Sequence, residues 1–337
     1  DPLSEGKHIE LGFFSYPFNE KSSFNSFSST QTWCWQQGCM LQWDPKNKSS
    51  RVYYNALVEG KFGSHLYDIN KSKIIKKIKS PIYSINPNGE NFLTINFSRL
   101  DRFRPGYGYN NFSNVKLSNC PTGDGLFLQN FSSDSKKLIA PIRELANNFS
   151  YNPDDNHYIN HATFSPDGEK ISFFYIISSK NKRKIIFTIF DLNNENYFFL
   201  EANRNTSHYC WQDNNRILTT NIDKNKITRY SIYNIKKNKR KDLFSNLNCD
   251  GHPMFSPKDK NIFITDTYPD KRRNQHLLLI DLKNEKINLI DSFYSPQNFT
   301  GQVRCDLHPR WDIQGKSICI DTPLNKKRNM VVIKFDE

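Results

Sequence analysis

Six copies of one short motif constrain this chain more than any other feature. Each copy has an anchor residue, usually aromatic, followed by a turn and then by a run of apolar residues. The anchors are Trp43, Ile85, Phe164, Trp211, Phe255 and Trp311. Successive anchors lie 42, 79, 47, 44 and 56 residues apart. Repetition at this spacing indicates one supersecondary unit per repeat, with each unit stacked on its neighbours.

The residues between the anchors indicate that each unit is a small antiparallel sheet. Short β-rich runs, such as 185–200 and 276–290, are separated by Asn, Asp, Gly, Pro and Lys turns. The only helical candidate is 137–149, as a short helix or a loop turn. One sheet per repeat predicts an all-β fold, a single β-propeller domain over residues 1–337. We expect seven blades, with the N-terminal segment 8–35 closing the ring and supplying most of the seventh.

Four consecutive repeats carry a histidine three residues before the anchor. These histidines are His161, His208, His252 and His308. The first two repeats have Met40 and Ile82 at this position. Because this strand lies nearest the axis of a propeller, we expect the imidazoles to converge on one side of a central site. They either bind a metal ion, transfer protons, or are an inherited turn in which His caps a backbone carbonyl.

Other donor residues precede two of these histidines. The run "CDGH" leads into His252, and "GQVRCDLH" leads into His308 with Gln302, Arg304 and Cys305. A Cys/His zinc site fits this pattern, and so do small cysteines buried on inner strands. The seven cysteines are an odd number without a CxxC pair, so we expect no complete disulfide framework.

The longest gap between anchors contains an insertion at about 100–122, which begins in the run "RLDRFRPGYGY". The candidate binding residues of this run are Arg99, Arg102, Arg104, Tyr107 and Tyr109. Arginine binds carboxylates through two parallel hydrogen bonds, and tyrosine stacks on sugar rings or donates a proton. The alternative is a surface loop that packs on its own blade. Near the N-terminus, Trp33, Trp35 and Gln37 form either a sugar-binding platform or part of the ring closure.

The charge of the chain points to an anionic partner or to compositional drift. Lys and Arg total 47 against 34 Asp and Glu, which gives a formal net charge of +13. No nucleic-acid motif accompanies this charge, and no apolar run reaches the roughly 18 residues of a membrane helix. We expect a monomer. The chain begins at Asp1 and has no recognisable signal peptide, so the compartment stays open between the cytoplasm and the periplasm or exterior.

Several segments resemble the propeller-type polysaccharide lyases, and more closely the oligogalacturonate lyases than the ulvan lyases. These segments are "HATFSPDG", "SHYCWQD", "DGHPMFSP", "TDTYPD" and "RCDLHPRW". The likeness runs from about residue 30 to the C-terminus, and its "FSPDG" parts are shared with TolB-like propellers. The resemblance implies a seven-bladed propeller that cleaves uronate-containing glycans by β-elimination.

The resemblance also implies a divalent metal, manganese or else zinc, held by histidines and a glutamine. By position these ligands are His252, His308 and Gln302. Cys305 and Asp306 stand where a further ligand histidine is expected, so the metal differs or the site is remodelled, with Cys305 as the candidate ligand.

The chemistry implied for the other residues follows from β-elimination. The metal or Arg104 would neutralise the uronate carboxylate, His208 or His161 would take the proton, and Tyr107 or Tyr109 would protonate the leaving oxygen. The substrate-binding candidates are Arg99, Arg102, Trp33, Trp35, Gln37 and Arg304. One alternative is a non-catalytic propeller that binds an acidic glycan or a protein. A glycosidase is a weaker alternative, because no carboxylate pair is evident.

Overall fold

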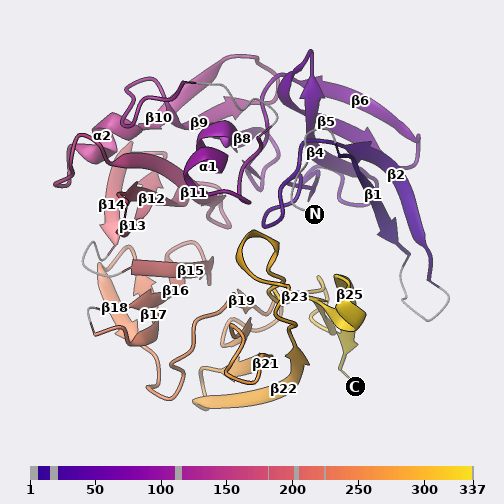
Figure 1. Ribbon diagram of the computed structural model, residues 1–337, viewed down its shortest axis with the longest axis vertical. Helices are drawn as coiled ribbons and strands as arrows, with labels where there is room; N and C mark the ends of the chain where they lie inside the picture. The colour runs from indigo at the N-terminus through magenta and orange to yellow at the C-terminus, as the bar shows by residue number, and fades with distance from the viewer. Residues whose placement is uncertain are drawn as a thin grey trace. The chain divides into compact units, whose positions relative to one another are not determined.

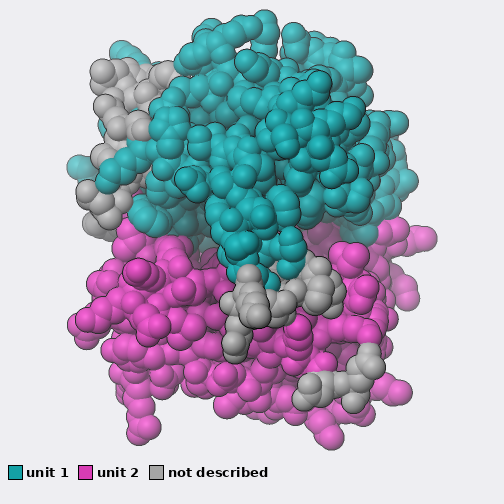
Figure 2. Space-filling view, turned by 90° about the vertical axis from the view of Figure 1, so that its right-hand side faces the viewer, with its two compact units in different colours: residues 1–200 teal, residues 201–337 magenta. Residues whose placement is uncertain are grey.

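A computed structural model describes residues 7–15, 22–110, 116–180, 182–200, 205–223 and 225–335. The chain divides into two compact units, Asp1–Leu200 and Glu201–Glu337, which Figure 2 colours separately. We call these unit 1 and unit 2 and describe each by itself. The prediction of one domain over the whole chain stays a prediction. No helix among the described residues is long and apolar enough to cross a membrane.

Unit 1 contains three four-stranded antiparallel sheets, each formed by strands consecutive in the chain (Figure 1). The first contains β3 (Gln42–Trp43), β4 (Arg51–Val58), β5 (Lys61–Asp68) and β6 (Lys73–Ile78). The second contains β7 (Ser84–Ile85), β8 (Asn91–Thr94), β9 (Gly125–Asn130) and β10 (Lys136–Pro141). The third contains β11 (Asn156–Phe164), β12 (Lys170–Ser178), β13 (Arg183–Asp191) and β14 (Asn196–Leu200).

Unit 2 contains two four-stranded sheets and one three-stranded sheet, again in chain order. The first contains β15 (Asn205–Trp211), β16 (Arg216–Ile222), β17 (Thr228–Asn234) and β18 (Lys239–Asp242). The second contains β19 (Met254–Phe255), β20 (Ile262–Asp266), β21 (Asn274–Asp281) and β22 (Lys286–Tyr294). The third contains β23 (Arg310–Trp311), β24 (Ser317–Thr322) and β25 (Asn329–Lys334).

The repeat read from the sequence matches these sheets. Every one of the six anchors is the last residue of the first strand of its sheet, as Phe164 is for β11 and Trp211 for β15. A turn follows the anchor and leads into the second strand of the sheet. This strand can be buried on both of its faces. In β12, residues 171–177 are all buried. Full burial of one such Phe or Ile side chain contributes about 1.5–3 kcal/mol.

The N-terminal segment forms a hairpin of its own. β1 (Ile9–Phe14) pairs with β2 (Phe24–Thr30) in a two-stranded sheet, and Leu11 packs in a core cluster with Tyr54 of β4. The sheets therefore give an all-β fold of six blades, and a seventh blade is not shown. Part of the predicted closing segment, residues 16–21, lies outside the described residues.

The few helices are short. α2 (Ile142–Ala146) falls inside the helical candidate 137–149, whose first residues belong to β10. α1 (Phe97–Phe103) was not expected, and it occupies the start of the insertion predicted at about 100–122. The side chain of Asn96 caps α1 by accepting a hydrogen bond from the backbone N–H of Arg99. Residues 111–115 of the insertion lie outside the described residues. The 3-10 helices are η1 (Gly301–Val303) and η2 (Leu324–Lys326).

Candidate functional site

Three of the four repeat histidines come together in unit 2. His208 lies on β15, His252 lies two residues before β19, and His308 lies two residues before β23. The ring centroids of His208 and His252 are 4.1 Å apart, and those of His252 and His308 are 3.9 Å apart. We call these three residues the histidine row.

Carboxylates hold two members of the row by Nδ1. His208 donates from Nδ1 to Asp250 Oδ1 at 3.0 Å, and His252 donates from Nδ1 to Asp266 Oδ1 at 2.9 Å. With Nδ1 protonated and fixed, Nε2 of each ring carries the lone pair that can bind a metal or accept a proton. The carboxylates therefore orient the rings and select their tautomers.

Asp266 also holds the backbone of the row. The backbone N–H of His252 donates to Asp266 Oδ1 at 2.7 Å, and that of His308 donates to Asp266 Oδ2 at 3.0 Å. A Cβ atom on Gly251 would lie 1.8 Å from the carbonyl oxygen of Asp266. Only glycine fits so close an approach, so Gly251 allows His252 to reach this carboxylate.

The repeat position itself has an irregular backbone. His161 and His308 have φ angles of 53° and 42°, and Met40 at the same position has 54°. The left-handed region is uncommon for residues other than glycine. The register of β15 also shifts between Thr206 and His208. Such bulges redirect a side chain and are common beside functional sites.

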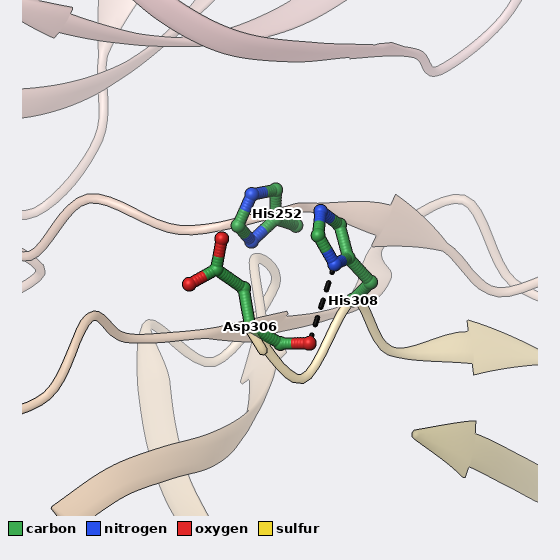
Figure 3. A group of neighbouring side chains, drawn as sticks. All are labelled: His252, Asp306 and His308. Atoms are coloured by element: carbon green, nitrogen blue, oxygen red, sulfur yellow. Dashed lines mark hydrogen bonds between the residues drawn. The ribbon is translucent and has the colours of Figure 1, made fainter. Parts of the chain in front are cut away.

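One group in unit 2 has the donors of a metal site. The ligand atoms of His252, Asp306 and His308 all lie within 4.8 Å of one another. Figure 3 shows the two imidazole rings next to each other with the Asp306 carboxylate beside them. His308 Nδ1 donates to the backbone oxygen of Asp306 at 3.3 Å. The lone pair that can bind a metal therefore lies on Nε2 of that ring. Two imidazoles and one carboxylate suit Mn, Fe or Zn, so these residues fit the metal that the resemblance implies.

Burial keeps the imidazoles of His252 and His308 neutral. Burial, followed by the neighbouring His252, lowers the pKa of His308 to about 3, and burial with His208 lowers the pKa of His252 well below its usual range. Neutral imidazole is the form that binds a metal. Burial raises the pKa of the Asp250 carboxyl, but the hydrogen bond and charge of His208, together with the hydrogen bonds of Ser207 and Thr220, outweigh burial and lower that pKa to about 2.

The other two predicted metal ligands lie outside this group. Cys305 is 2% exposed, and burial raises the pKa of its thiol to about 11. The thiolate is the metal-binding form, so a thiol that remains protonated at neutral pH is a poor ligand. Gln302 lies in η1 and is exposed. The group contains Asp306 in place of the expected Cys305.

Two residues at the edge of the row complete the unit 2 site. The Tyr268 ring centroid lies 6.1 Å from that of His208 and 5.9 Å from that of His252. The Arg304 guanidinium lies 5.9 Å from the Tyr268 ring and contacts Asp306 Oδ2 at 2.5 Å. Arg304 was predicted, whereas Tyr268 and Asp266 were not. Both belong to "TDTYPD", whose Asp266 ends β20.

A second cluster of predicted residues lies in unit 1. The Arg104 guanidinium is 3.9 Å from the ring centroid of Tyr107, whose centroid is 5.9 Å from that of His161. Tyr83 Oη accepts hydrogen bonds from the His161 backbone N–H and from Gln37 Nε2, both at 2.7 Å. We call Arg104, Tyr107 and His161 the unit 1 cluster.

Other predicted residues of unit 1 have packing roles. Tyr109 is fully buried, stacks on Phe97 at 4.4 Å, and accepts a hydrogen bond from Asn55. Arg99 is 3% exposed and contacts Asp124 at 2.7 Å. The catalytic role predicted for Tyr109 and the substrate-binding role predicted for Arg99 stay predictions.

The remaining predicted residues lie nearer the surface of unit 1. Arg102 is exposed on α1. Trp33 and Trp35 make an edge-to-face contact at 5.1 Å, and Trp33 Nε1 donates to the Lys7 backbone oxygen. This contact joins Trp33 to the residue before the predicted closing segment 8–35, and both alternatives for the tryptophans stay predictions.

Comparison of this chain with known proteins identifies its fold through solved structures. No family model and no curated protein matches the chain. A solved structure of an oligogalacturonate lyase in complex with manganese matches with a TM-score of 0.67 at 12% identity, over 93% of this chain and 80% of that one. The chain has the same β-propeller fold as this structure.

Two further structures share this propeller fold. An oligogalacturonate lyase from Vibrio parahaemolyticus matches with a TM-score of 0.65 at 10% identity, over 93% of this chain and 81% of that one. A structure described in a study of two prolyl endopeptidases matches with a TM-score of 0.56 at 8% identity, over all of this chain and 49% of that one. Because the propeller serves such different proteins, the fold does not select the function.

Proposed function

We propose that the protein is a lyase that cleaves an acidic, uronate-containing glycan by β-elimination. The observation that carries the proposal is that a candidate general base lies next to a candidate metal site. A histidine oriented by a carboxylate, His208 with Asp250, packs at 4.1 Å against a histidine of the metal-binding group. The two solved oligogalacturonate lyases with the same fold support the substrate class.

The first chemical step is removal of the proton beside the substrate carboxylate. His208 Nε2 would accept this proton while Asp250 stabilises the imidazolium through Nδ1–H. The electrons of the broken C–H bond form a C=C bond, and the bond to the neighbouring glycosidic oxygen breaks. A divalent ion held by His252, Asp306 and His308 would supply positive charge to the carboxylate and make the adjacent proton more acidic.

The departing oxygen then needs a proton. The Tyr268 ring contacts the rings of His208 and His252, and its hydroxyl is the donor that we assign, with water as the other source. Arg304, beside Tyr268, would bind the carboxylate of the sugar. Arg104, Tyr107 and His161 of unit 1 remain candidates from the sequence alone.

The test is turnover on a panel of polyuronates with and without added Mn²⁺. We expect an unsaturated product, detected by its ultraviolet absorbance, and its loss in His208→Ala. His276 on β21 is the matched control, because it is a histidine of unit 2 outside the row, and His276→Ala should retain activity. Glycan binding without turnover, unchanged by chelation, would instead favour a non-catalytic glycan-binding propeller.

A further inference from the structure

A second concave site lies in unit 2, along the edge strand of its first sheet. The cavity has a volume of about 470 Å³, within the range of ligand sites. The turn after β15, the end of β17 and strand β18 line one side, and Asn261, Leu282 and Glu285 of the next sheet line the other. We call this site the β18 groove.

The groove carries unpaired positive charge. Its charged lining residues are Arg216, Lys239, Arg240, Lys241, Asp242 and Glu285. The two arginines already contact carboxylates, those of Asp213 and Asp242. Lys239 and Lys241 have no carboxylate partner within the described ranges. Two exposed ammonium groups on one short strand favour an anionic ligand.

A buried acceptor in the same groove also lacks a partner. Gln212 is 3% exposed, and its Nε2 donates to the Lys260 backbone oxygen at 2.7 Å. Its Oε1 accepts no hydrogen bond from any described residue. Leaving a buried acceptor unsatisfied costs about 1–3 kcal/mol. Because Oε1 is fully buried, a hydroxyl of a bound ligand would supply the missing donor once the Gln212 side chain turns toward the groove.

The groove also has apolar lining residues beside the charged and amide side chains. These are Ile232, Leu243, Phe244 and Leu282. A ligand that fits the groove therefore has carboxylates, hydroxyls and a flat C–H face together, and an acidic sugar chain has all three. The site is distinct from the histidine row, because four residues of strand, about 13 Å, separate Gln212 from His208.

We propose that the β18 groove is a second binding site for the acidic glycan, which holds polymeric substrate away from the reacting bond. The choice of glycan rests on the proposed function. Lys239 and Lys241 bind sugar carboxylates, Gln212 Oε1 accepts from a hydroxyl, and Phe244 packs on a ring.

The test uses charge reversal with a matched control on the same hairpin. Lys239→Glu/Lys241→Glu changes the groove, whereas Lys236→Glu/Lys237→Glu makes the same charge change in residues that do not line it. Affinity for polyuronate is measured by affinity electrophoresis, and turnover is compared on polyuronate and on a short oligouronate. We expect the groove variant to bind the polymer at least tenfold more weakly. A tenfold change in affinity corresponds to about 1.4 kcal/mol. Its turnover on the short substrate should not change.

Three outcomes would overturn the proposal: equal losses in both double variants, no loss in either, or RNA bound more tightly than polyuronate and lost in the same variant. Gln212→Met is a second test, because it removes the amide acceptor and leaves the charge unchanged. We expect it to weaken polymer binding. The two proposals fail separately. Absence of unsaturated product overturns the lyase but leaves the binding assay to decide the groove, and turnover with unaffected polymer binding overturns only the groove.

Discussion

The two units treat the same repeat position differently. In unit 1, His161 packs edge-to-face on Tyr107 and on Phe174. In unit 2, His208 and His252 each donate to a carboxylate, and the row continues to His308. The repeat therefore supplies the imidazoles, and residues outside the motif decide what each imidazole can do. In unit 2, Asp250 and Asp266 accept from Nδ1 of His208 and His252 and so orient these two rings.

The largest effect that would sharpen this comparison is on activity. Asp250→Asn keeps the shape of the side chain but removes the charge that stabilises His208 as an imidazolium, and it allows the other tautomer. We expect the rate of elimination to fall by about 100-fold or more, as for loss of a general base. Asp270→Asn, near His276, is the control and should leave the rate within a factor of about two. Equal rates in the two variants would remove Asp250 from the mechanism.

A buried histidine of unit 1 provides a contrast in pH dependence. Burial lowers the pKa of His157 from 6.5 to about 4, and its Nδ1 contacts Tyr175 Oη at 2.5 Å. The unfolded chain binds this proton at higher pH, so the stabilisation is complete above pH 6.5 and is lost as the pH falls toward 4. The loss is on the order of 3 kcal/mol.

His157→Gln should therefore unfold with a weaker pH dependence than the wild type over this interval, as measured by denaturant titration. His276→Gln makes the same substitution outside this buried contact and serves as the control. An identical slope in wild type and His157→Gln would show that His157 titrates alike in the folded and unfolded chain.

The close approach before His252 provides a smaller effect, on stability. Gly251→Ala places a methyl group against the Asp266 carbonyl, and we expect a loss of about 2 kcal/mol in the free energy of unfolding. Gly123→Ala is the matched control, because an added Cβ there meets nothing within 4 Å, and its effect should stay within about 0.5 kcal/mol. Thermal or denaturant unfolding separates the two. Equal stability of the two variants would mean that the backbone at Gly251 shifts to accommodate the methyl group and that the row shifts with it.

Much of the fold could be predicted from the sequence because the signal is local. An anchor, a turn and a β-rich run lie within a dozen residues, so Phe164 and Trp211 marked the ends of first strands correctly. Contacts between residues on separate turns leave no such local pattern in the sequence. The contact of Asp266 with His308 joins two sheets, and its contact with His252 joins two strands across a turn. The burial of Tyr109 likewise depends on residues outside its own run, such as Asn55. The choice of Asp306 over Cys305 depends on which neighbouring side chain turns toward the imidazoles.

The central claim is that the row in unit 2 is a metal-dependent site. It is tested most directly by elemental analysis of the purified protein, with anomalous scattering from its crystals to locate any metal. The account predicts one divalent ion per chain, bound by His252, Asp306 and His308, and its loss in His252→Ala with retention in His161→Ala. An ion bound elsewhere, or none after incubation with Mn²⁺ or Zn²⁺, would contradict it.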